Sequence, residues 1–103
     1  MQTSEETKIC GVTRALEVMG GKWTLLIIRD LLDRPRRFGE LATSLDRISP
    51  RTLAIRLKEL EHEGVLRRDC SAGDSHPVYR LTTKGRSLSA IVDQMRTWGE
   101  ATA

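Results

Sequence analysis

The segment SPRTLAIRLKELEHEG, residues 49–64, groups four side chains that could contact the edges of DNA bases. Arg51, Thr52, Ile55 and Arg56 fall within about two turns of a predicted helix. An arginine can donate a bidentate pair of hydrogen bonds to guanine, and threonine and isoleucine methyl groups can touch the thymine methyl. These residue types at these spacings therefore predict contact with the major groove of DNA.

The same segment separates a packing side from an outward side. At about 100° per residue, Leu53, Leu57 and Leu60 lie within about 60° of one another and form a stripe for a core. Ser49 can cap the free N–H groups of the first turn, and Pro50 suits that turn because it has no N–H to satisfy. The outward residues are Arg51, Ile55, Lys58 and His62. Lys58 and His62 lie further from the N-terminal end and are left out of the predicted site. The competing interpretation is a solvated basic face with one ordinary exposed isoleucine.

The elements around this segment follow from hydrophobic periodicity. Apolar residues at helical spacing predict a first helix that ends at Gly20-Gly21 and a central buried helix in KWTLLIIRDLLD, residues 22–33. RPRRF, residues 34–38, predicts a turn or a short extended piece. The elements predicted next are a supporting helix at 38–45, a tight connector at 46–49, a helix at 50–63, a two-stranded hairpin at 65–83 and a long amphipathic helix from Thr83 to the end.

Two short helices joined by a tight turn and followed by a hairpin form a winged helix-turn-helix. The predicted fold class is therefore mainly α with a β-hairpin wing (α+β). The wing of such a fold lies over the minor groove or the backbone, where basic residues contact DNA. The predicted DNA-binding residues are Arg36, Arg37, Ser49, Arg51, Thr52, Ile55, Arg56, Arg67, Arg68, Ser75 and His76. Simple solubility is the alternative role for the basic cluster at 34–37 and for the hairpin charges.

The charge distribution favours an anionic partner. The net charge is +3, and residues 34–68 hold nine bases and five acids, whereas residues 1–33 hold four and five and residues 69–103 hold four of each. A segregated positive zone of this kind indicates an anionic partner such as nucleic acid, and the alternative is the ordinary variation of charge among helix surfaces. The 103 residues suffice for a single domain, 1–103, in which residues 1–8 are expected to form a flexible tail. Because no apolar stretch is long enough to span a membrane and the N-terminus is polar, we expect a cytoplasmic protein with no membrane partner.

Cys10 is the candidate for reactive chemistry. It lies just before a helix N-terminus and two residues from Lys8, and both features lower the pKa of a thiol. The alternative is a small apolar residue packed in an interface. Cys70 falls in a predicted strand and is expected to be structural. The spacing of the two cysteines and two histidines fits no metal site, and no catalytic or phosphate-loop motif is present. We therefore expect no enzyme activity, no metal and no cofactor.

Several motifs follow one another along the chain: Cys10, GGKWTLLIIRDLL at 20–32, RRFGEL at 36–41, ISPRTLAIRLKELEHEGVLRR at 48–68, YRLTTKGRSL at 79–88 and Trp98. Together they resemble the HxlR-type branch of MarR-like winged-helix transcriptional regulators, over nearly the whole chain beyond the tail. The resemblance implies a repressor or activator that binds a pseudo-palindromic operator as a homodimer. It also implies a response to oxidants or electrophiles, with Cys10 as the redox sensor. Gly11 departs from the proline common in the family, and the short wing, residues 71–77, puts the reach of the tip contacts in doubt.

The resemblance also implies that the N- and C-terminal helices form the dimer interface. The sequence supports this independently, because the apolar stripe of the C-terminal helix is long and few other elements could cover it. The predicted interface residues are Val12, Leu16, Leu88, Ile91, Val92, Met95 and Trp98. The alternative is that the stripe only closes the core of one chain. A two-fold dimer suits two half-sites about one helical turn apart.

Two alternative functions remain open at this point. One is a constitutive or small-molecule-responsive regulator without thiol sensing, in which an effector binds between the dimer helices and the DNA-binding lobe. The other is a winged-helix protein-interaction module. Binding by such a module would not fall steeply with salt, whereas DNA binding would.

Overall fold

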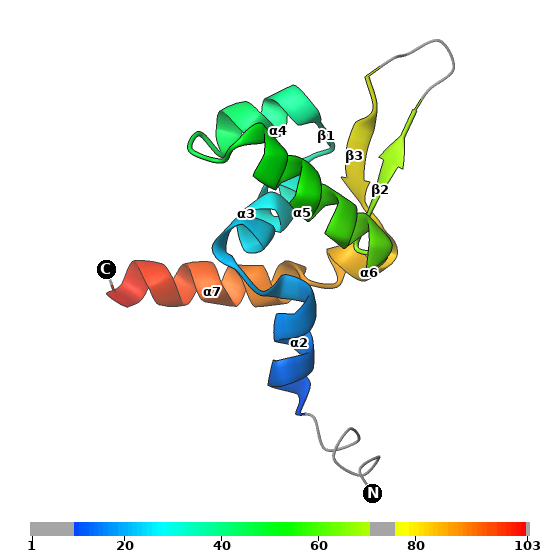
Figure 1. Cartoon of the computed structure of the whole chain (residues 1–103). Helices are drawn as coiled ribbons and strands as arrows, with labels where there is room; N and C mark the ends of the chain where they lie inside the picture. Colours follow the sequence, from blue (N-terminus) through cyan, green and yellow to red (C-terminus); the bar gives the residue numbers. More distant parts are fainter. Residues whose placement is uncertain (1–9, 71–75, 103) are drawn as a thin grey trace, which may run out of the picture.

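The computed structural model describes residues 10–70 and 76–102, and these form a helical body with a hairpin at one end and two helices that project from the body (Figure 1). The elements are α2 (Gly11–Met19), α3 (Lys22–Asp33), β1 (Arg36–Arg37), α4 (Phe38–Ser44), α5 (Pro50–His62), β2 (Leu66–Asp69), β3 (Val78–Leu81), α6 (Thr83–Arg86) and α7 (Ser89–Thr102). The predicted winged helix-turn-helix is confirmed, and the helices at 38–45 and 50–63 each end one residue earlier than predicted. The flexible tail predicted at residues 1–8 and the contact predicted for Ser75 lie outside the described residues. Over the described ranges, no helix combines the length and the apolar character that crossing a membrane requires.

Helix α3 is the centre of the hydrophobic core. Ile27 and Ile28 of α3 are completely buried, because this helix is apolar on most of its sides. The predicted stripe of α5 packs into the same core, and Leu53, Leu57 and Leu60 are all buried. Burying each leucine side chain contributes about 1.5–3 kcal/mol, so this stripe fixes the rotation of α5 about its own axis.

A tight turn joins α4 to α5 and sets their relative direction. The Leu45 N–H donates to the Leu41 carbonyl at 2.9 Å, and the Ile48 N–H donates to the Leu45 carbonyl at 3.3 Å. Between them, Asp46 has φ 47°, in the left-handed region that aspartate tolerates better than most residues. Leu45 and Ile48 are both buried, so the two ends of the turn are anchored in the core.

The predicted hairpin is part of a three-stranded antiparallel sheet with the order β1-β3-β2. Leu66 pairs with Leu81 and Arg68 with Tyr79, while β1 places Arg36 on the other side of Tyr79. The sequence indicated only a turn or short extended piece for β1, because two residues carry no periodicity. Along β2, Leu66 is buried and the next residue is exposed, as expected where one face of a sheet meets a core.

The C-terminal helix is divided, although the sequence predicted one continuous helix from Thr83. Residues 87–88 form a turn between α6 and α7. Thr82 Oγ1 accepts a hydrogen bond from the Gly85 N–H at 3.1 Å, and the Thr82 N–H donates to the Val65 carbonyl at 3.0 Å. These bonds hold α6 against the start of β2, and α7 then leaves the body in a new direction (Figure 1).

Gly85 packs so closely on β2 that replacing it should destabilise the protein. A Cβ at Gly85 would collide with the backbone carbonyl oxygen of Val65, which belongs to the core and cannot rotate away. We expect Gly85→Ala to lower the free energy of unfolding by about 1–3 kcal/mol, measured by urea denaturation.

Gly39→Ala provides the matched control, since a Cβ at Gly39 meets no atom within 4 Å. This substitution lies in α4, where alanine is the better helix former by about 0.5–1 kcal/mol. Equal stability of the two variants would contradict the close packing of α6 on β2.

Candidate nucleic-acid interface

The N-terminal end of α5 is capped and exposed. Ser49 Oγ accepts a hydrogen bond from the Thr52 N–H at 3.0 Å and donates one to Thr52 Oγ1 at 2.9 Å. Pro50 occupies the first turn of the helix. The predicted cap is therefore confirmed. The two hydroxyl groups bond to each other, and the positive end of the helix dipole faces solvent.

The outward side of α5 has the composition that its angular pattern predicted. Arg51 is exposed, and Ile55 retains 43% of its surface although it is a large apolar residue. Within residues 10–70 and 76–102, the side chain of Arg51 makes no hydrogen bond or ion pair. Its guanidinium is therefore available to an acceptor outside the chain.

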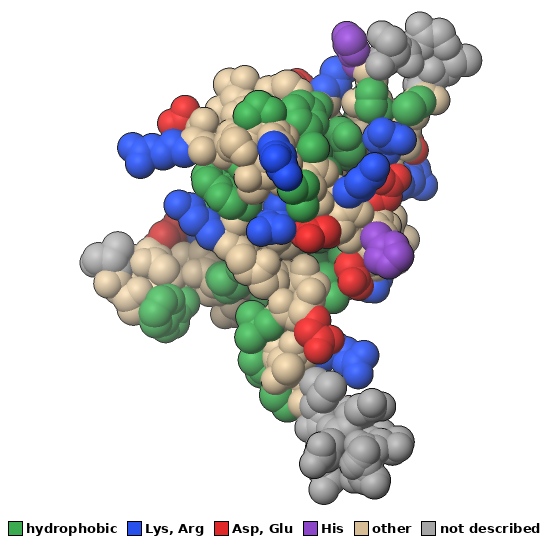
Figure 2. Space-filling view, viewed as in Figure 1, with side chains coloured by type: hydrophobic (Ala, Val, Ile, Leu, Met, Phe, Trp, Pro, Cys, Tyr) green, Lys and Arg blue, Asp and Glu red, His purple; other side chains and the backbone are tan. Residues whose placement is uncertain are grey.

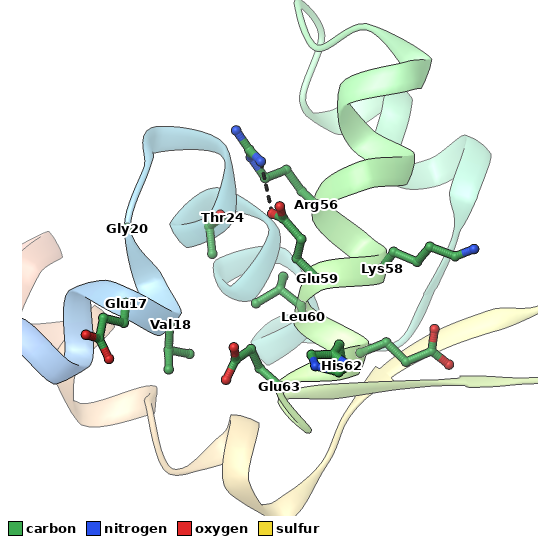
Figure 3. Close-up of a pocket in the computed structure, with 11 residues that line it drawn as sticks. Glu17, Val18, Gly20, Thr24, Arg56, Lys58, Glu59, Leu60, His62 and Glu63 are labelled. Carbon is green, nitrogen blue, oxygen red and sulfur yellow. Dashed lines mark hydrogen bonds and ion pairs between the residues drawn. The ribbon is translucent and has the colours of Figure 1, made fainter.

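Arg56 lies on a different side of α5 and already has a partner. Its Nη1 is 2.9 Å from Glu59 Oε1, and the pair lines a cavity of about 800 Å³ between α2, α3 and α5 (Figure 3). The acids that line this cavity are Glu17, Glu59, Glu61 and Glu63. Carboxylates repel phosphates. The C-terminal half of α5 on this side is therefore unsuited to DNA, and a base contact from Arg56 would have to replace its bond to Glu59.

Arg67 and Arg68, which the sequence treated alike, differ in the structure. Arg67 Nε lies 3.3 Å from Asp69 Oδ1, while Arg80 Nε lies 2.6 Å from Asp69 Oδ2. Asp69 thus holds two arginines on one face of the hairpin, a role that sequence analysis missed. The alternation of β2 was the available signal, because it places residues 67 and 69 on the same face. His76, also predicted to bind DNA, is exposed at the base of the wing tip.

The two arginines of β1 are engaged in the fold. Arg36 keeps only 15% of its side-chain surface, and its Nη2 is 3.0 Å from Asp33 Oδ2. Arg37 Nη1 donates to the His76 carbonyl at 2.7 Å, and the Arg37 N–H donates to Glu40 Oε1 at 2.8 Å. The latter bond lowers the pKa of Glu40. Both arginines thus connect β1 to its surroundings, and Arg36 is less accessible than the sequence suggested.

Basic side chains are prominent on one part of the surface. Lysine and arginine side chains lie over α5 and the adjoining hairpin, with acidic side chains among them, and further acidic side chains lie toward the end of α5 and on α2 (Figure 2). A phosphate backbone would therefore be attracted to the N-terminal part of α5 and to its hairpin side. No group of three metal-ligating side chains occurs in the described part of the chain.

Cys10 caps α2 and is exposed, at a distance from the basic surface. Its Sγ accepts a hydrogen bond from the Thr13 N–H at 3.4 Å and lies 3.4 Å from Thr13 Oγ1. The bond to the Thr13 side chain, followed by the bond from its backbone N–H, lowers the pKa of the Cys10 thiol. These contacts favour the thiolate, which is the nucleophilic form. Cys70, expected to be structural, follows the end of β2 and is exposed.

Exposed apolar side chains mark the two projecting helices. Val12 and Leu16 of α2 keep 70% and 59% of their surface, and Trp98 of α7 keeps 70%. Ile91 and Met95 of α7 are also exposed. The other two residues of the predicted interface differ, because Val92 is buried in the core of its own chain and Leu88 packs against that core. The exposed part of the set therefore comprises Val12, Leu16, Ile91, Met95 and Trp98.

Comparison with known proteins identifies relatives of nearly the full described length. Residues 18–103 match the family model described as HxlR-like helix-turn-helix. The HTH-type transcriptional regulator YdeP of Bacillus subtilis is 34% identical over 95% of this chain and 77% of its own length. The reduced form of the redox regulator HypR has a TM-score of 0.84 and 36% identity, covering 89% of this chain and 92% of that one. The quinone-bound structure of YodB from B. subtilis has a TM-score of 0.75 and 36% identity, covering 87% and 96%.

The hydrogen bonds of Cys10 predict how its reactivity depends on pH. Thr13→Val keeps the shape of the side chain but removes the hydroxyl that contributes most to lowering the pKa of Cys10. Because the lowered pKa maintains the thiolate at lower pH, we expect this variant to shift the midpoint of alkylation toward higher pH. The measurement is the rate of reaction with iodoacetamide between pH 5 and 10 in a Cys70→Ser background.

Thr43→Val makes the same chemical change on α4, away from Cys10, and should leave the midpoint in place. An unchanged midpoint in Thr13→Val would show that the contacts between Thr13 and Cys10 do not tune the thiol.

Proposed function

The chain belongs to the HxlR-like helix-turn-helix family of transcriptional regulators and is not an enzyme, and we propose that it binds a pseudo-palindromic operator as a homodimer. In this proposal α5 enters the major groove and the hairpin lies over the adjacent minor groove. The observation that carries it is the exposed, capped end of α5, where Arg51 has no partner among the described residues and Ile55 faces solvent.

Arg51 is the residue proposed to read a base most directly. It lies in the first turn of α5, the part of a recognition helix that meets base edges, and can form a bidentate pair with guanine. Ile55, one turn further along the same side, suits a thymine methyl. Ser49 and Thr52 lie beside the helix N-terminus, where a phosphate oxygen is favoured. Arg56 is less suited to contact a base, because it would have to break its ion pair with Glu59 to bind DNA.

The homodimer is proposed to form through α2 and α7. Five large apolar side chains are exposed on these two helices, an arrangement typical of an interface rather than of a free surface. A two-fold axis between such helices would present two copies of α5 to two half-sites. The packing of the apolar faces in this dimer would therefore set the distance between the two α5 helices, and with it the length of the operator.

Cys10 is proposed to be the sensor of this regulator. Its lowered pKa, its exposure and its place two residues before Val12 support a thiolate whose modification would disturb the α2 face. Two similar structures are those of the redox regulator HypR and of the quinone-bound regulator YodB. With a quinone, the Cys10 sulfur would form a bond to a ring carbon. The electron pair of the attacked double bond would move to a quinone oxygen, which takes up the thiol proton. The hydrogen of the attacked ring carbon would then move to the second oxygen, which gives a hydroquinone thioether.

Two other functions are distinguished by the experiments below. A regulator without thiol sensing would bind DNA with the same dependence on salt but would ignore Cys10 modification. A protein-interaction module would bind DNA weakly and with a flat response to salt. The positive side of α5 favours the DNA-binding function over such a module.

The proposed DNA binding makes a quantitative prediction about salt and Arg51. A dimer that neutralises about 6–10 phosphates should lose roughly three orders of magnitude or more in affinity between 50 and 200 mM salt. Arg51→Ala should weaken binding by about 1–3 kcal/mol per half-site and relax the preference for one base, because a bidentate contact is lost. Fluorescence anisotropy with a duplex selected from a random pool by the wild-type protein measures both effects.

Arg56→Ala removes the same charge from the same helix and is expected to have a smaller effect, because Glu59 already pairs with Arg56. A flat salt response of the wild-type protein would rule out the DNA-binding proposal.

The proposed sensor makes a separate prediction. Treatment with benzoquinone should release the wild-type protein from its selected DNA and add one quinone mass at Cys10, because the exposed thiolate is the nucleophile. Cys10→Ser should remain bound, whereas Cys70→Ser should be released like the wild type. If benzoquinone released Cys10→Ser to the same extent as the wild type, Cys10 would not be the sensor.

A further inference from the structure

A groove between α5 and the hairpin contains two cations that come from elements far apart in the sequence. It has a volume of about 260 Å³ and is lined by Ala54, Ile55, Leu57, Lys58, Glu61, Arg68 and Tyr79. Lys58 and Arg56 leave α5 on opposite sides (Figure 3), and Lys58 lines this groove as well as the edge of the cavity that the glutamates line. The sequence placed Lys58 outside the site because it lies far from the helix start. The structure instead places it beside the hairpin.

Strand alternation directs Arg68 into this groove. Leu66 and Arg68 lie on the same face of β2, and Leu66 is buried beneath α5 and the rest of the core. On β3, Tyr79 lies directly opposite Arg68 and is half-buried on this face. Arg67 points to the other face, where it shares Asp69 with Arg80. Only one of the two adjacent arginines of β2 therefore faces α5.

The two cations of the groove have no internal counterion among the residues that the structure describes. Neither the Lys58 nor the Arg68 side chain makes an ion pair or a hydrogen bond there. Glu61 lines the same groove from the last part of α5 but pairs with neither. Two like charges around one cavity raise each other's electrostatic energy, and an anion between them would lower it.

The geometry of duplex DNA indicates which anion this is. The major and minor grooves are separated by a single sugar–phosphate strand. A helix in the major groove and a hairpin over the adjacent minor groove must therefore lie on opposite sides of that strand. The groove between α5 and the hairpin is the place where the strand would pass, and its two cations would attract the single negative charge of a phosphodiester.

We propose that Lys58 and Arg68 together bind one backbone phosphate, with Tyr79 forming the wall of the groove. The arginine supplies a planar pair of donors and the lysine a point charge on a flexible stem, so the two can hold one phosphate from two sides. The Glu61 carboxylate would repel the next phosphate along the strand, so that a single phosphate occupies the groove. The inference rests on the proposed DNA binding and deepens it, because this contact sets the register of α5 in the major groove.

The test compares Lys58→Met and Arg68→Met with wild type by anisotropy, using the selected duplex and a shuffled duplex. Methionine keeps the apolar stem and removes the charge. Each variant should bind both duplexes about tenfold more weakly, because a phosphate contact carries no sequence information. The double variant should also lower the salt slope by about one per half-site. Unchanged affinity and slope would overturn the inference, as would a loss confined to the selected duplex, which would indicate a base contact.

Two further variants on the same elements sharpen the result. Arg67→Met removes the neighbouring charge on the opposite face of β2 and should change affinity less than threefold. Glu61→Gln should tighten binding to both duplexes, because it removes the repelling carboxylate without altering the cations. Circular dichroism melting shows that each variant is folded. A steep salt response of the wild type together with unchanged Lys58 and Arg68 variants would refute only this inference, whereas a flat wild-type response would refute DNA binding itself.

Discussion

The burial of one leucine stripe against α3 determines which side of α5 meets solvent, and the candidate interface depends on that orientation. Leu53, Leu57 and Leu60 are buried in the same core as Ile27 and Ile28. Rotating α5 by one residue, about 100°, would expose these leucines and bury polar neighbours, at a cost of several kcal/mol. The residues that face DNA in our proposal make few contacts of their own. The core therefore positions the site.

Pairing among the charged side chains then determines which lysine and arginine side chains remain available to DNA. Asp33, Glu59 and Asp69 each hold at least one arginine, so much of the positive charge of residues 34–68 is already neutralised within the chain. Arg51, Lys58 and Arg68 have no such partner among the described residues. They lie on the outward side of α5 and on the hairpin face toward it. Fewer basic side chains are thus available to DNA than the count of basic residues indicates.

The sequence predicted the helix-turn-helix well because its signals are local. A serine cap, a proline in the first turn and a leucine stripe locate α5 without tertiary information. The signals failed where distant segments meet: β1 exists only because it pairs with β3, and the close packing of Gly85 of α6 on Val65 has no local signal. The separation of Arg67 from Arg68 was visible in strand alternation. The groove that joins Lys58 to Arg68 was not, because it depends on how the hairpin leans against α5.

In our proposal, the exposed faces of α2 and α7 pair two chains and so connect this interface to an operator of defined length. Two copies related by a two-fold axis would place two α5 helices on the same side of a duplex. Hydroxyl-radical footprinting on the selected duplex, with the mass of the complex from sedimentation, tests this account most directly. We predict two chains per duplex and two protected regions centred about one helical turn, roughly 10 base pairs, apart. A single protected region occupied by one chain would contradict it.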